Sequence, residues 1–123
     1  MIFSPVVIAG DLWTVVREPA GGGGLIDRTG SHRLATADAS ARKIRISADL
    51  PPDLIDRVVL HEIAHAITMS HGLLDELRSY LPEDLWIPVE EWAARLVEGH
   101  GIEAVDLASR VLGRPVCIRG ICR

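Results

Sequence analysis

The stretch VVLHEIAHAITMSHG, Val58 to Gly72, decides the fold prediction because it places two histidines and a glutamate inside an apolar run. At about 100° per residue, His61 and His65 lie roughly 40° apart on a helix, and Glu62 lies about 100° from His61. Apolar residues occupy most of the remaining circumference, so we expect a helix buried nearly all round. Burying polar groups without partners costs several kcal/mol each. The three side chains therefore need a partner.

A zinc ion would be that partner. Two imidazoles four residues apart on a helix bind one Zn²⁺, and a glutamate between them reaches a water molecule bound to the metal. His61 and His65 are thus the predicted zinc ligands. Glu62 is the predicted general base, which would activate the zinc-bound water for peptide-bond hydrolysis. The motif predicts a zinc metallopeptidase acting on a peptide or protein.

Three residues compete for the third ligand position. His71 stands ten residues after His61, but Thr68 occupies the position where a chain turning back to the metal needs glycine. Glu91 lies thirty residues after His61, at the start of a later helix that could pack across the first. Glu90 is its neighbour, about 100° round that helix, so only one of the two glutamates can point at the metal.

A non-catalytic alternative is a binding or adaptor module that zinc merely stabilises. A structural site has no use for a general base at Glu62 and is usually closed by a fourth ligand, often cysteine. Cys117 and Cys122 are the two cysteines; they could pair if exposed to an oxidant, but we expect two free thiols in a late hairpin or tail. For an oxyanion stabiliser, only residue type nominates His71, Tyr80 and His100.

The first half of the chain reads as strands. The runs PVVIAG and LWTVVRE are β-branched, a weak strand is expected near 34–37, and a clearer one at 43–47. The strand at 43–47 is also a candidate edge strand for holding an extended peptide. Four glycines, Gly21 to Gly24, lie in a predicted loop that we interpret as a flexible connector.

The second half reads as helices. The segment DLPPDL is a helix start signal, with Asp49 as a candidate cap, and the helix should end near Ser70. A short turn at DELRSYL follows. We expect a helix from Pro88 to Gly99 or Gly101, whose apolar side is formed by Trp92, Ala93, Leu96 and Val97. The segment IEAVDLASRVLG should form a last, separate helix.

These elements predict one α+β domain over residues 1–123, mainly β in 1–48, mainly α in 49–113, with a tail at 114–123. The net charge of -4 gives no basic surface for nucleic acid or for an anionic membrane. The N-terminal segment lacks the charged region and long apolar run of a signal peptide or membrane span. We therefore expect a soluble cytoplasmic protein, or one delivered without a cleaved signal, with no nucleic-acid or membrane partner.

The order of ARKIRISADLPPDLIDRVVLHEIAHAI and EEWAARLVEGHG resembles the small gluzincin-type peptidases of the ImmA/IrrE group and their phage-encoded relatives. The resemblance covers residues 41–101. It implies a minimal zincin-like domain, a small N-terminal sheet followed by an active-site helix and two or three further helices. Matched residue by residue, it implies zinc ligands His61, His65 and Glu91, with Glu62 as the base.

Overall fold

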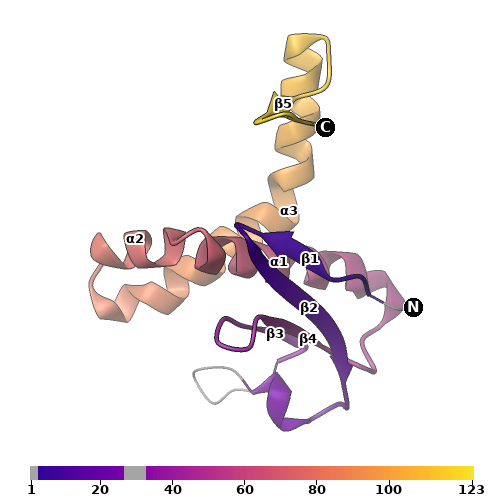
Figure 1. Ribbon diagram of the computed structural model, residues 1–123, viewed down its shortest axis with the longest axis vertical. Helices are drawn as coiled ribbons and strands as arrows, with labels where there is room; N and C mark the ends of the chain where they lie inside the picture. Colours follow the sequence, from indigo (N-terminus) through magenta and orange to yellow (C-terminus); the bar gives the residue numbers. More distant parts are fainter. Residues whose placement is uncertain (1–2, 27–32) are drawn as a thin grey trace.

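Four strands form a mixed sheet in the order β1-β2-β4-β3, within a computed structural model that describes residues 3–26 and 33–123 (Figure 1). The outer pairs β1–β2 and β3–β4 are antiparallel, whereas the central pair β2–β4 is parallel. Residues 27–32, part of the loop predicted from sequence, lie outside the described residues. The strands are β1 Val6–Ile8, β2 Asp11–Glu18, β3 Ala35–Asp38 and β4 Lys43–Ser47.

Strand β4 is an inner strand, so the expectation that it forms an edge for a peptide is wrong. It pairs with β2 on one side and with β3 on the other. Its side chains alternate, with Ile44 and Ile46 completely buried and Lys43 and Arg45 half-buried on the opposite face. The edge beside the later helices is instead β3, which among residues 3–26 and 33–123 pairs with a strand on one side only.

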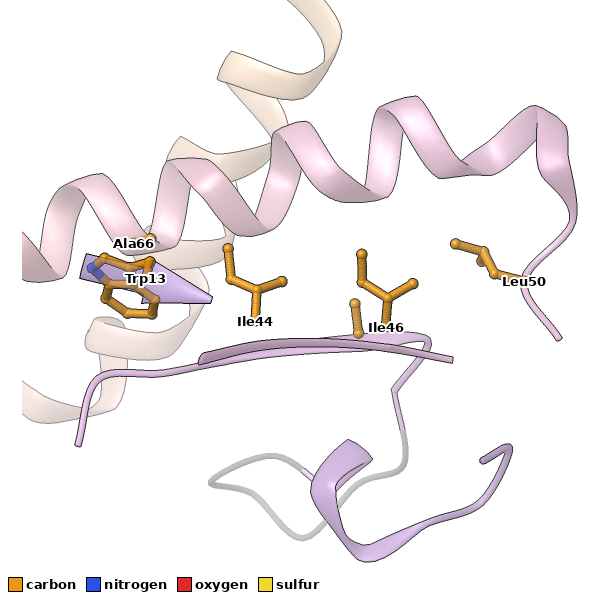
Figure 2. Packing of buried hydrophobic residues seen from close by; sticks show 6 residues of the cluster. Trp13, Ile44, Ile46, Leu50 and Ala66 are labelled. Atoms are coloured by element: carbon orange, nitrogen blue, oxygen red, sulfur yellow. The ribbon is translucent and has the colours of Figure 1, made fainter. Parts of the chain in front are cut away.

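The core lies between this sheet and helix α1, Ile55–Ser70 (Figure 2). Trp13 from β2, the two isoleucines of β4 and Leu50 lie in a row beneath the helix, and Ala66 of α1 lies beside Trp13 at one end of the row. The indole Nε1 of Trp13 also donates a hydrogen bond of 2.7 Å to Ser70 Oγ at the end of the helix. This contact links the sheet to the last turn of α1.

Helix α1 is buried on one side rather than nearly all round. Glu62, Ala64, His65 and Ala66 are buried, whereas Arg57 and Ile67 are exposed. Helix α1 packs against the sheet on one side and against α3 on another, and the rest of its surface faces solvent. The predicted end at Ser70 is confirmed. Asp49 does not cap the helix but accepts a hydrogen bond from Ser47, and a 3-10 turn, η2 Pro52–Leu54, precedes the first residue.

One long helix replaces the two predicted near the C-terminus. Helix α2, Leu73–Ser79, and a 3-10 turn, η3 Glu83–Leu85, lead into α3, Trp86–Leu112, which continues without a break through Gly99 and Gly101. A helix-interior glycine costs only about 1 kcal/mol relative to alanine, so the helix continues where its neighbours favour it. Figure 1 shows the second half of α3 standing away from the body.

The tail forms a small hairpin, β5 Cys117–Ile118 and β6 Ile121–Cys122. The prediction of free thiols is wrong, because a disulfide joins Cys117 to Cys122. The two cysteines face each other in the hairpin register, which brings the sulfurs within bonding reach. Within residues 3–26 and 33–123, no helix combines the length and the hydropathy that crossing a membrane requires.

The glycine-rich segment is packed rather than a free connector. Its last residues form a 3-10 turn, η1 Gly23–Leu25, and Leu25 is fully buried. A Cβ on Gly24 would lie 2.6 Å from the side chain of Arg45, so this position has no room for a side chain without a shift of Arg45. Thr36 on β3 donates a hydrogen bond of 2.7 Å to the carbonyl of Gly24, which fixes the turn against the sheet.

Candidate metal centre

Three side chains predicted as zinc ligands meet between α1 and α3. The Nε2 atoms of His61 and His65 lie 3.3 Å apart. One carboxylate oxygen of Glu91 lies 3.2 Å from His61 Nε2, and the other lies 3.2 Å from His65 Nε2. One ligand atom from each residue falls within 4.8 Å of the others.

These separations fit a small tetrahedral ion. Ligand atoms bonded at about 2.0–2.1 Å to a tetrahedral centre lie roughly 3.3–3.4 Å apart, which is close to the 3.3 Å between the two imidazole nitrogens and to the 3.2 Å from each nitrogen to its nearer Glu91 oxygen. Two imidazoles and one carboxylate are also a donor set used for catalytic zinc, which leaves the fourth position open. The cluster could therefore hold zinc without rearrangement of the helices.

Helix periodicity brings the cluster together. His61 and His65 lie one turn apart on α1, and α3 packs across that face with Ala94 buried against it. An alanine at the crossing lets the two helix axes approach closely. The carboxylate of Glu91, one turn before Ala94 on α3, therefore reaches the open side of both imidazoles.

The neighbouring glutamate turns elsewhere. Glu90 is only 4% exposed and accepts hydrogen bonds of 3.1 and 2.9 Å from Nε and Nη2 of Arg78 on α2. Arg78 also lies over the Trp86 ring, 5.1 Å from its centroid. Glu90 therefore ties α2 to α3, and Glu91 is the glutamate that faces the histidines.

Glu62 lies in the wall of the same cavity. Glu62 is only 7% exposed, and this burial raises the pKa of its carboxyl. The nearby imidazoles of His65 and His61 lower the same pKa by a smaller amount. The cavity is about 860 Å³ and is lined by all three cluster residues and by Glu62. Further lining residues come from the η1 turn, from β3 and from α2, among them Gly24, Thr36, Asp38 and Arg78.

Glu98 on α3, which was not predicted from the sequence, contacts the cluster from outside. Glu98 Oε1 lies 3.2 Å from His61 Nδ1, and Glu98 Oε2 accepts a hydrogen bond of 2.7 Å from Arg57. Hydrogen bonding to Arg57 lowers the pKa of Glu98, so its carboxylate accepts the Nδ1 proton of His61. The spacing of the residues could have predicted this contact. Glu98 lies two helical turns after Glu91, and Arg57 lies one turn before His61, so each shares a helix side with a cluster residue.

The cluster electrostatics follow from these contacts. Hydrogen bonds from His61, and next from His65, hold the pKa of Glu91 well below its usual range. The hydrogen bond to Glu91 is the main cause that raises the pKa of His61. Both ring nitrogens of His61 therefore face carboxylate oxygens, which favours a positive charge at the centre of the cluster.

The other nominated residues lie away from the cavity. His71 is exposed at the C-terminal cap of α1, which agrees with helix continuation through Thr68. Tyr80 and His100 are exposed, and His100 contacts Glu103 instead. None of the three lines the cavity.

The predicted apolar side of the Glu91 helix is also wrong. Trp92, Leu96 and Val97 are exposed, and the inward-facing residues are instead Glu91, Ala94 and Glu98 toward α1 and Glu90 toward α2. Four residues of the interior face are thus three glutamates and an alanine, a pattern that hydropathy alone assigns to solvent.

Comparison with protein-family models, curated proteins and solved structures finds no match for this chain.

Proposed function

We propose that the protein is a zinc-dependent metallopeptidase with a minimal zincin-like domain. The observation that supports it is the convergence of His61, His65 and Glu91 next to a buried Glu62 in one cavity. Zinc held there would supply a Lewis acid that polarises a carbonyl group and acidifies a water molecule. The resemblance of residues 41–101 to the ImmA/IrrE group points to the same chemistry.

The residues of the chain divide the remaining work. His61, His65 and Glu91 would hold the metal, and Glu98 orients the His61 ring through Nδ1. Glu62 would take a proton from the attacking water and deliver it to the leaving nitrogen of the peptide bond.

The cavity suits an extended chain. Strand β3 lines it, and within the part of the chain that the structure describes its outer edge pairs with no strand, so a peptide could add as a further strand beside the cluster. Because β3 rather than β4 is the edge, the bound segment would pass directly over the face of α1 that bears the histidines. We therefore propose a peptide or protein segment in extended conformation as substrate.

The adaptor alternative is less well supported. A structural zinc site is usually closed by a fourth protein ligand, but Cys117 and Cys122 are bonded to each other in the distal hairpin. A buried glutamate in the cavity wall would also be costly without a use. Both observations favour a site with an open position and a base.

The experiment that tests the proposal compares Glu62→Gln with the natural chain. We expect about one zinc per chain in both proteins, and cleavage of an unfolded protein substrate by the natural chain only, because the amide cannot accept a proton. Zinc content is measured by elemental analysis and cleavage by mass spectrometry. Equal cleavage by both proteins would contradict the assignment of Glu62.

The ligand set is tested separately with Glu91→Ala and the matched variant His71→Ala. Glu91→Ala should lose zinc during dialysis, because it removes one of three ligands, whereas His71→Ala should retain it. Zinc that stays with Glu91→Ala, or leaves with His71→Ala, would exclude the proposed ligand set.

A further inference from the structure

The side of α3 that packs on α1 continues beyond the body of the protein. Ala94 and Glu98 are succeeded, at alternating spacings of three and four residues, by Gly101, Val105, Ala108 and Leu112. This spacing keeps residues on one side of a helix and is typical of helix–helix contacts. We call the last four residues the distal stripe. No residue from 99 to 123 is buried, so within one chain the distal stripe has no helix against it.

Apolar residues flank the distal stripe on both sides, and the far side of the helix is polar. Ile102, 77% exposed, and Val111, 87% exposed, lie about 180° apart round the helix, one on each side of the stripe. Asp106 and Arg110 form an ion pair of 2.8 Å on the polar side. The C-terminal hairpin approaches near Ser109 and Arg110, and it leaves Val105 and Leu112 open.

The distal stripe is complementary to itself in one antiparallel register. A two-fold axis between residues 106 and 107 places Val105 opposite Ala108 of a second copy, and Gly101 opposite Leu112 of that copy. Each large side chain then meets a small one, which is the condition for close packing of two helices. The charged residues 103, 106 and 110 stay on the outside of the pair.

The exposed area agrees with a missing neighbour. The chain exposes 8104 Å², whereas a compact protein of its mass exposes about 6,500 Å². A standard protein interface covers about 800 Å² on each partner. The excess is therefore enough to supply an interface, and the protruding half of α3 in Figure 1 is where the chain departs from a compact shape.

We infer that the protein forms a two-fold symmetric dimer in which residues 101–112 of α3 pack antiparallel against the same segment of a second copy. The occupant is a second copy because the large-to-small pairing is satisfied by the sequence of the distal stripe itself. An interface of this kind is isologous and closes at two chains. The inference does not depend on the proposed peptidase activity.

The test is sedimentation velocity of the full chain at concentrations up to ~200 µM, well above the Kd of a micromolar interface. We expect twice the mass of one chain for the natural protein and the mass of one chain for Val105→Glu. The matched control is Leu107→Glu, an identical change of character about 160° away round the helix, which should remain a dimer. Circular dichroism should show unchanged helix content, since Val105 is exposed within one chain.

Three results would overturn the inference. The natural chain could sediment as one chain at every concentration. Val105→Glu could leave the dimer intact. Both glutamate variants could dissociate it equally, which would mean that the distal stripe is not the specific surface. Zinc content is unchanged in every one of these cases if the metal proposal holds, so the two proposals fail separately.

Discussion

At the scale of single residues, Glu98 explains how one histidine of the cluster is held. A ligand histidine must present one nitrogen to the metal, and the hydrogen bond at its other nitrogen sets the tautomer and the ring orientation. Glu98 Oε1 occupies that second position at 3.2 Å from His61 Nδ1. Arg57 holds the other Glu98 oxygen at 2.7 Å, so the carboxylate is itself fixed.

We predict that Glu98→Ala weakens zinc binding by about 10- to 100-fold, because the His61 ring loses its outer partner. Glu103→Ala is the matched control, since Glu103 is exposed on the same helix and contacts only His100 among the pairs described for it. Competition with a chromophoric chelator measures both affinities. Equal affinity in Glu98→Ala and the natural chain would show that Glu98 does not orient His61.

At the scale of elements, the turn between β3 and β4 is organised by Asp38. Its Oδ1 accepts hydrogen bonds from the backbone and hydroxyl of Ser40 and from the backbone of Ala41. Its Oδ2 lies 3.2 Å from Arg45 Nη1. These contacts, the Ser40 hydroxyl first, lower the pKa of Asp38 from 3.8 to about 2.

A lowered pKa means that ionised Asp38 stabilises the folded chain above its unfolded pKa. That stability is present above about pH 4 and is lost as the pH falls toward 2. Because the side chain is about a third exposed, we expect Asp38→Ala to reduce the free energy of unfolding by about 1 kcal/mol or less at pH 6. Urea denaturation should show this difference shrinking near pH 2. A difference that is the same at both pH values would contradict the role of the charge.

At the scale of the whole molecule, Trp13 joins the sheet layer to the helix layer. It is 1% exposed, and its indole reaches Ser70 at the end of α1. The position of α1 on the sheet, and so of His61 and His65 over β3, depends on this packing. We predict that Trp13→Ala lowers the free energy of unfolding by about 3–5 kcal/mol.

Trp92→Ala is the matched control for that change. Trp92 is an equally large side chain, but it is exposed on α3, and its truncation should change the stability by no more than about 0.5 kcal/mol. Urea denaturation of the two variants gives the comparison. A large loss in Trp92→Ala would show that α3 packs through the face predicted from hydropathy.

Local pattern alone determined much of this molecule. The α+β order, the strand at 43–47 and the helix that ends at Ser70 follow from periodicities of two and 3.6 residues and from punctuation by glycine and proline. The common face of His61 and His65 follows from the same helical period. These features depend on residues a few positions apart, so the sequence displays them directly.

Tertiary structure decided the features that depend on distant contacts. The choice of Glu91 over Glu90, and the part played by Glu98, are set by how α3 crosses α1, thirty or more residues away in the chain. The edge position of β3 is set by which strands pair. The continuity of α3 through Gly99 and Gly101 depends on whether the helix preference of the neighbouring residues outweighs the cost of the two glycines. Three glutamates could face inward only because histidines and arginines from other helices neutralise them, and hydropathy along one segment has no access to such partners.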